Sequence, residues 1–358
     1  MIAFLFFLIV AIVADPSPYP EVDVFVAGDG GYSCHKIPYL FVTRSKTLLV
    51  FAEARWGGCW DWSPTDLVFK RSTDNGRTWS PLQIMVTNSS HENNISNVVG
   101  NAAPVQLAST GRVLVPYCRN NLEVWQTYSD DDGVTWATPE QVPTATRPGW
   151  MWMGTGPPGG LQLVSGRIVV PAYFSLVNNT NGEISRSVLL LNDDSNGAAS
   201  AWYIGAIAPG WQLTNECQAV EIAPNHILVA ARGILMQRIQ IESTDGGLTL
   251  GEPYYVSIGE PLEGCEGSII RHPSGTLFYS GTTNTSLLRY NMTVWTSTNQ
   301  GKAWDLKVVV NQGRTGYSSL QVMPNQQDVG LLYERSNLTG LFFIPTQISF
   351  LVVWPVPN

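Results

Sequence analysis

One residue of this sequence that could do acid–base chemistry is an aspartate in a tryptophan-rich loop. Asp61 lies in a glycine-containing stretch that also holds Trp56, Trp60 and Trp62. A carboxyl group among such rings could be partly desolvated, which would raise its pKa as a general acid requires. The alternative is that an aspartate in such a loop only forms a turn. The nearest competing acid, Asp66, directly precedes an expected strand, where we expect a structural role.

A second group of polar residues stands at or near the ends of expected strands. Glu216 precedes a strand, Arg232 ends one, and Arg289 lies within a third apolar stretch. Tyr317 and Glu334 follow in two more strands. A phenol can act as a nucleophile when a neighbouring carboxylate takes its proton. Arginine presents a planar fork that binds a carboxylate through two hydrogen bonds. The alternative for both arginines is solvated surface charge.

The elements that must position these residues are marked by a repeated octapeptide of the form S-x-D-x-G-x-x-W. Good copies begin at Ser72, Ser129 and Ser297, and a degraded copy begins at Ser243. Aspartate accepts hydrogen bonds from nearby backbone N–H groups, glycine supplies positive φ, and tryptophan anchors the turn from below. Self-similarity at about 50–60 residues is typical of propeller blades. The sequence therefore predicts many short strands joined by tight turns.

The octapeptide is identified as the Asp-box, and together with the polar residues above it makes the chain resemble the sialidase (neuraminidase) family. The resemblance covers nearly all of the chain after residue 20. It implies an all-β fold, a six-bladed β-propeller, with the boxes at blade turns away from the substrate. We therefore interpret the box aspartates as structural. We expect residues 15–358 to form this catalytic domain, with both terminal strands closing the ring side by side.

The resemblance also implies a role for each candidate site residue. Sialidases open with an Arg-Ile-Pro motif and then a strand that ends in Glu-x-Arg, which here are residues 36–38 and 53–55. It implies that Tyr317 is the nucleophile, that Glu216 takes its proton, and that Asp61 is the general acid and base. The carboxylate of the substrate would be bound by Lys36, Arg232 and Arg289. Supporting or sugar-binding positions are expected at Arg55, Glu334, Asn101, Trp152 and Tyr173, of which the two aromatic residues have core packing as their alternative.

Lys36 is the position where the sequence departs from the family pattern, because sialidases have an arginine there. A lysine keeps the positive charge but offers a point ammonium instead of a planar fork. We expect activity that is weakened or retuned, with Glu334 beside Lys36 as its paired charge. The alternative is an ordinary surface lysine on a strand.

These assignments imply a retaining exo-glycosidase that releases a terminal sialic acid or a related nonulosonic acid, of the N-acetylneuraminic or Kdn type, from glycoconjugates. No cofactor and no metal are expected. Two alternatives stay open: a sialidase-like sugar-binding protein (a lectin) with little or no turnover, and a trans-sialidase. The joint presence of Asp61, Glu216 and Tyr317 favours the enzyme, because a lectin does not need a nucleophile.

Composition bounds the class of partner. The chain has 358 residues, of which 44% are hydrophobic and 13% charged, so it is expected to be globular. Its net charge of −8 argues against a nucleic-acid partner. That charge does not forbid an anionic sugar, which needs only a local cationic pocket.

The N-terminus and the glycosylation sequons predict a secretory route. Residues 1–14 form an apolar run that is too short to cross a bilayer comfortably, so we interpret it as a signal peptide. We therefore expect secretion, or residence in the secretory lumen, and no stable membrane anchor. Sequons of the N-x-S/T type occur at Asn88, Asn94, Asn178, Asn284, Asn291 and Asn337.

Five cysteines in a secretory chain allow two disulfides and one free thiol. Cys34 and Cys59 flank candidate site residues in the first half of the chain, and Cys217 and Cys265 do so in the second half. We predict the pairs 34–59 and 217–265, with Cys118 free, although the sequence alone does not fix connectivity.

Overall fold

The computed structural model describes residues 20–87, 97–178, 182–210, 213–233, 235–283, 286–340 and 342–355. The predicted signal peptide, residues 1–14, and the sequons at Asn88, Asn94 and Asn284 lie outside the described residues. Among the described residues, no helix is long and apolar enough to cross a membrane.

Strand β3 (Leu48–Arg55) shows why the apolar runs of this sequence form buried strands. All eight of its residues are buried. Side chains alternate between the two faces of a strand, and here the two faces enter different cores. Leu48 and Val50 pack in a cluster with Phe25, whereas Leu49 and Phe51 pack in a cluster with neighbouring-sheet residues. Each such sheet is therefore covered on both faces by the sheets beside it, which explains a run that is apolar throughout.

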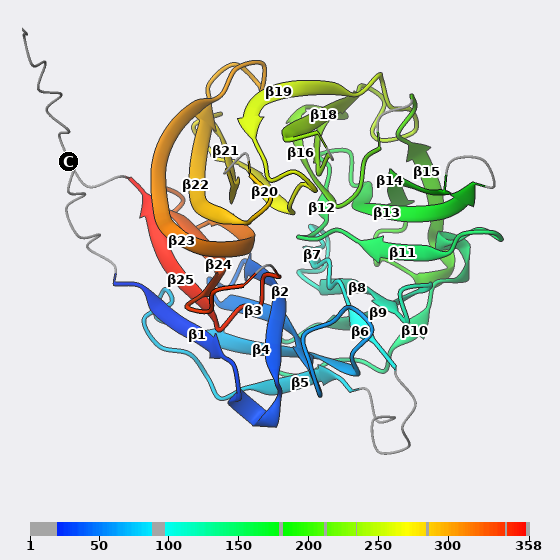
Figure 1. Cartoon of the computed structure of the whole chain (residues 1–358). Coiled ribbons are helices and arrows are strands. Elements are labelled where there is room, and N and C mark those ends of the chain that lie inside the picture. The colour runs from blue at the N-terminus through cyan, green and yellow to red at the C-terminus, as the bar shows by residue number, and fades with distance from the viewer. Residues whose placement is uncertain are drawn as a thin grey trace, which may run out of the picture.

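The strands form five antiparallel sheets that follow one another around a ring (Figure 1). The first contains β2 (Cys34–Val42), β3, β4 (Thr65–Ser72) and β5 (Gln83–Val86). The second contains β6 (Val99–Gly100), β7 (Val105–Gln106), β8 (Val113–Arg119), β9 (Glu123–Ser129) and β10 (Glu140–Gln141). The third contains β11 (Trp152–Thr155), β12 (Leu161–Gln162), β13 (Ile168–Asn178), β14 (Gly182–Asn192) and β15 (Trp202–Ile207).

The fourth sheet contains β16 (Cys217–Ala223), β17 (His226–Ala231), β18 (Gln237–Ser243) and β19 (Tyr254–Gly259). The fifth has seven strands: β20 (Gly267–Arg271), β21 (Leu277–Thr282), β22 (Tyr290–Ser297), β23 (Asp305–Val322), β24 (Val329–Ser336), β25 (Gln347–Trp354) and β1 (Val22–Val26). Short 3-10 helices occur at η1 (Asp29–Gly31), η3 (Pro143–Ala145) and η4 (Ala199–Ala201). The expected all-β propeller is confirmed, but the described residues form five hydrogen-bonded sheets, so the count of six blades stays a prediction.

The N-terminal strand closes the ring beside the C-terminal one (Figure 1). β1 pairs antiparallel with β25, and Phe25, which is fully buried, enters the core between the sheets. Polar contacts reinforce the seam: Arg335 Nη2 lies 2.7 Å from Asp23 Oδ1, and Ser349 Oγ donates to the same oxygen. The predicted closure by both ends is therefore present, and it leaves β25 paired on both sides.

Each repeated octapeptide begins at the last residue of a strand, β4, β9, β18 or β22, and forms a tight turn. In the copy that begins at Ser129, Asp131 Oδ1 accepts from the backbone N–H groups of Val134 (3.1 Å) and Thr135 (2.8 Å). Strand register places these turns away from the polar residues of interest. β3 pairs with β4 so that Leu48 faces Ser72 at the turn end and Arg55 faces Thr65 at the opposite end.

Candidate active site

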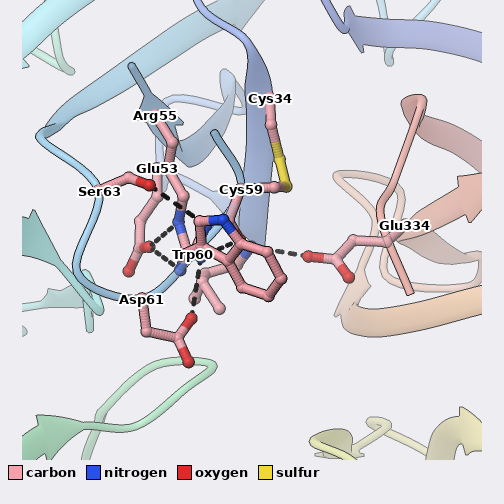
Figure 2. The surroundings of a disulfide bond; sticks show 9 residues. Cys34, Glu53, Arg55, Cys59, Trp60, Asp61, Ser63 and Glu334 are labelled. Atoms are coloured by element: carbon pink, nitrogen blue, oxygen red, sulfur yellow. Dashed lines mark hydrogen bonds and ion pairs between the residues drawn. A yellow bond between two sulfur atoms is a disulfide. The ribbon is translucent and has the colours of Figure 1, made fainter. Parts of the chain in front are cut away.

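Asp61 is held at the site end of the first sheet by an arginine and a disulfide (Figure 2). The Cys34–Cys59 bond, which confirms that predicted pair, ties the loop after β3 to the start of β2. Arg55 ends β3 with 2% of its surface exposed. Its Nη1 donates to Asp61 Oδ1 at 2.8 Å and to the carbonyl oxygen of Cys59 at 2.8 Å, while its Nε and Nη2 donate to Glu53.

The predicted rise in the pKa of Asp61 is wrong. Partial desolvation does raise the pKa, but Arg55, and also the charges of Lys36 and Arg289, outweigh it and lower the pKa below the ordinary value. The tryptophans do not enclose the carboxyl group, because the Asp61 side chain is 58% exposed and Trp60 and Trp62 stack on each other at 5.6 Å instead. In the structure as it stands, Asp61 is a carboxylate.

Asp66 has the structural role expected of it. It is buried, and its Oδ2 accepts from the Tyr32 hydroxyl at 2.7 Å and from Trp56 Nε1 at 3.2 Å. Trp56 therefore bonds to Asp66 and does not surround Asp61.

A glutamate just before β16, an arginine just after β17 and a tyrosine within β23 meet in one cluster. The Tyr317 hydroxyl donates to Glu216 Oε1, and Arg232 Nη1 donates to Glu216 Oε2 at 2.8 Å and to the Tyr317 oxygen at 3.3 Å. Tyr317 and Glu216 are 6% and 4% exposed. Burial first, and then the charge of Glu216, raise the pKa of Tyr317 well above its usual range. Tyr317 is thus a neutral phenol whose proton already points at a carboxylate.

Lys36 and Arg289 lie against the ring of Tyr317. Lys36 Nζ is 5.6 Å from the ring centroid and Arg289 Cζ is 5.4 Å from it. Burial lowers the pKa of Lys36, and the charge of Glu334 partly opposes that shift. Lys36 is a buried residue of β2, so it is not the surface lysine of the alternative interpretation.

Glu334 does not form the expected direct pair with Lys36. No ion pair within 4 Å joins the two among the described residues; Glu334 Oε1 accepts from the Ile37 N–H at 2.9 Å and Oε2 accepts from the Tyr317 N–H at 3.1 Å. Glycine at 316 permits this approach, since a Cβ there would lie 2.3 Å from Glu334 Oε2. Glu334 therefore fixes the backbone that carries Lys36 and Tyr317, and acts on the lysine through its charge.

The remaining predicted residues line a small pocket beside Tyr317. Asn101, Trp152 and Tyr173 border it with Glu216 and Tyr317. Trp152 Nε1 donates to the Tyr173 hydroxyl at 3.0 Å, and the Asn101 backbone N–H donates to Glu53 Oε1 at 2.9 Å.

A larger cavity of about 340 Å³ adjoins this pocket, and Asp61 borders both. Lys36, Arg289 and Arg314 line it, together with the exposed aromatic residues Trp60, Trp62 and Phe342. The structure thus brings cations, an acid and a tyrosine–glutamate pair to one end of the ring. Arg232 belongs to the tyrosine cluster and is absent from the lining of this cavity.

Three residues of the site were missed by sequence reasoning. Glu53 neutralises Arg55 and orients it; its place in the Glu-x-Arg motif was the available signal. Glu263 accepts two bonds from Arg232 through its carbonyl oxygen, at 3.0 and 3.1 Å, and no pattern marked it. Arg314 lines the cavity three residues before Tyr317, and its position within a strand gave no sign of that.

The predicted Cys217–Cys265 disulfide is wrong. Both residues, and Cys118, are buried free thiols. Cys217 packs in an apolar core and its thiol donates to the Ala172 carbonyl at 3.4 Å, whereas Cys265 packs against Ile37 and Tyr317. Cys217 and Cys265 both flank site residues in the sequence, but their side chains do not meet in the fold. Within the described part of the chain, no group of three or more His, Cys, Asp or Glu residues is arranged to hold a metal ion.

Comparison with known proteins gives relatives over most of the chain. The BNR repeat-like domain matches residues 118–333. Sialidase-3 of Rattus norvegicus is 28% identical over an alignment that spans 84% of this chain and 87% of the relative. A Hadza microbial sialidase has a similar structure, with a TM-score of 0.79 and 24% identity over 93% of this chain and 68% of its own. An intramolecular trans-sialidase from Ruminococcus gnavus gives a TM-score of 0.75 and 18% identity over 92% of this chain and 96% of its own.

Proposed function

This chain belongs to the BNR repeat-like domain family, and on that premise we propose that it is a retaining exo-sialidase with a tyrosine nucleophile. The observation that carries the proposal is the hydrogen bond from the Tyr317 hydroxyl to Glu216, which also pairs with Arg232. Asp61 lines the same small pocket as Tyr317 and Glu216. The names of the sialidase relatives support the same substrate class. The substrate is a terminal sialic acid or a related nonulosonic acid on a glycoconjugate.

The charges of the site fit a sugar that carries a carboxylate on its anomeric carbon. Lys36, Arg232 and Arg289 are the proposed ligands of that carboxylate. An anionic nucleophile would be repelled by it, whereas the neutral phenol of Tyr317 is not. Positive charge that develops on the anomeric carbon in the transition state is stabilised by the neighbouring carboxylate of the sugar.

Two displacements at the anomeric carbon give net retention. In the first, the Tyr317 oxygen forms a bond to that carbon and passes its proton to Glu216, while the glycosidic C–O bond breaks and the leaving oxygen takes a proton from Asp61. In the second, water attacks the same carbon and gives a proton to the Asp61 carboxylate. The bond from that carbon to Tyr317 breaks as the water attacks, and the phenol oxygen recovers its proton from Glu216. Atoms and protons balance over the cycle.

Covalent trapping tests the proposal. A 2,3-difluoro sialoside should label the wild-type protein on Tyr317, as shown by intact and peptide mass spectrometry. Tyr317→Phe should not be labelled, because no oxygen remains to attack. Undiminished labelling of Tyr317→Phe would remove that residue from the role of nucleophile.

Product analysis separates the alternative functions. Proton NMR of the first-formed product should show retention at the anomeric carbon. Sialoside binding without turnover would identify a sugar-binding protein, and transfer of the sugar to an added acceptor in preference to water would identify a trans-sialidase. Asp61→Ala should slow glycosides with poor leaving groups far more than nitrophenyl glycosides, which need little protonation.

Two further assignments belong to this proposal. The seven-stranded sheet is interpreted as two blades that share β23, whose first part pairs with β22 and whose last part pairs with β24; this division gives six blades. A secretory route is supported by the Cys34–Cys59 disulfide, since such bonds form in oxidising compartments, and by the exposed sequon at Asn337.

A further inference from the structure

Arg314 is a buried arginine with no polar partner among the described residues. It is 6% exposed, and its Nε and Nη1 atoms are buried with no hydrogen-bond acceptor among the described residues. No carboxylate of those residues lies within 4 Å of it, and its guanidinium is flanked by the rings of Tyr290 (5.2 Å) and Phe343 (5.8 Å). A buried guanidinium that lacks an anion is costly, so its position calls for an external partner.

The cavity that Arg314 lines is where such a partner would bind. Arg314 lines the same cavity as Lys36 and Arg289, and it is carried by β23, the strand that also carries Tyr317. The acids on this lining are Asp61, which is engaged by Arg55, and Glu263, which is exposed and forms no ion pair within 4 Å with a described residue. Three cations therefore share a cavity in which Asp61 is already paired.

We propose that Arg314 binds the carboxylate of the substrate and supplies the planar fork that Lys36 lacks. This inference rests on the proposed function. An ammonium makes point contacts with a carboxylate, whereas a guanidinium can meet both of its oxygens at once. The rings of Tyr290 and Phe343 flank the guanidinium, 5.2 and 5.8 Å from Cζ, and so limit where it can lie. The site thus replaces an arginine on β2 with one on β23.

A pair of ligands that differ only in the acid group tests this assignment. The 2,3-unsaturated analogue of sialic acid and its methyl ester would be titrated into wild type, Arg314→Met and Arg314→Lys by calorimetry. Arg314→Met should bind the acid roughly 10- to 150-fold more weakly, the loss expected for one or two charge-assisted hydrogen bonds. Its affinity for the ester should change less than about threefold. Arg314→Lys should fall between wild type and Arg314→Met on the acid.

Two results would overturn the inference. Unchanged affinity for the acid would show that Arg314 makes no contact with it. An equal loss on acid and ester would show that Arg314 only shapes the cavity. Arg77→Met, at an exposed position in an octapeptide turn at the other end of the strands, is the matched control and should bind both ligands as the wild type does.

A second comparison tests whether an arginine at position 36 can take over the role of Arg314. In the Arg314→Met background, Lys36→Arg should recover part of the affinity for the acid, because it restores a fork on the opposite strand. A loss seen only with leaving groups that carry sulfate or phosphate would assign Arg314 to a second anionic group and reject the carboxylate. If the wild type itself does not prefer the acid to the ester, the proposed function fails; if it does and Arg314→Met shows the same preference, only this inference fails. Should Arg314→Met not fold, Arg314→Lys gives the same test.

Discussion

At the scale of single residues, the charge state of Asp61 depends on what fills the cavity. Arg55, Lys36 and Arg289 all lower its pKa in the structure as it stands. A bound carboxylate would neutralise the last two and exclude water, and both changes raise the pKa of a neighbouring acid. Asp61 would then gain its proton when the substrate arrives.

The pH dependence of catalysis should report this change. Because the pKa of Asp61 in the free protein lies below its ordinary value, kcat/KM for a glycoside with a poor leaving group should fall as pH rises through the acid range. The descending limb of kcat, which reflects the bound complex, should lie at higher pH by about 1 unit or more, the shift expected from neutralising nearby charges. Steady-state kinetics between about pH 3 and pH 8 measure both limbs.

Asp61→Asn provides the control for this prediction. With a nitrophenyl glycoside, which needs little protonation, the variant should keep measurable activity and lose the descending limb that belongs to Asp61. Coincident limbs for kcat and kcat/KM in the wild type would show that the substrate does not change the pKa of this carboxyl group.

The sequence predicted which residues lie together better than it predicted their chemistry. Glu216 and Arg232 flank expected strands and Tyr317 lies within one, so their meeting could be expected once a ring fold was assumed. The pKa of Asp61 could not be predicted, because it depends on where the Arg55 side chain points and on two tryptophans that stack with each other. Arg314 escaped notice because an arginine within a strand resembles surface charge until its neighbours are known.

At the scale of elements, the disulfide restrains the loop after β3, which carries Asp61 (Figure 2). The bond spans a sequence separation of 25 residues and joins this loop to β2, the strand that carries Lys36. Arg55 then holds the carboxylate from the end of β3. The acid and the lysine are thus positioned by one covalent link.

Removal of this link should cost stability and acid catalysis together. Cys34→Ser/Cys59→Ser should lower the free energy of unfolding by about 3.5 kcal/mol, the value expected for a loop of this length. It should also reduce kcat more for poor leaving groups than for nitrophenyl glycosides, because a looser loop misplaces Asp61. Urea unfolding and the two rate ratios measure these effects.

Reductant gives the matched control. Dithiothreitol should destabilise the wild type and leave the double variant unchanged, since Cys118, Cys217 and Cys265 are already free. Equal rate losses on both classes of leaving group would mean that the bond stabilises the fold without positioning the acid.

At the scale of the whole molecule, ring closure is what the sequence predicted most clearly, because repeated turn signals and two apolar terminal strands permit few other arrangements. The count of six blades did not follow as directly. β23 runs for 18 residues and pairs with strands on both sides, so hydrogen bonding merges what repeats in the sequence suggested as separate units.

Loss of the seam residue Phe25 should destabilise the entire ring. Phe25→Ala removes a fully buried ring from the core and should cost about 3–5 kcal/mol. Val26→Ala, on the same strand but 37% exposed, should change stability by no more than about 0.5 kcal/mol. Because a loosened β1 uncovers the edge of β25, Phe25→Ala should also aggregate on mild heating. Urea unfolding and light scattering test both; similar costs for the two variants would show that the seam contributes little.

The contact between Glu334 and the backbone of Ile37 spans 297 positions of the chain and has a consequence for biosynthesis. A ribosome delivers Lys36 and Asp61 early, but the carboxylate that fixes their neighbour emerges near the end of translation. No nascent or prematurely terminated product that lacks β24 can hold the site in this form. The proposed activity is therefore expected only from chains synthesised through β24, so in a mixed preparation it excludes fragments that end before Glu334.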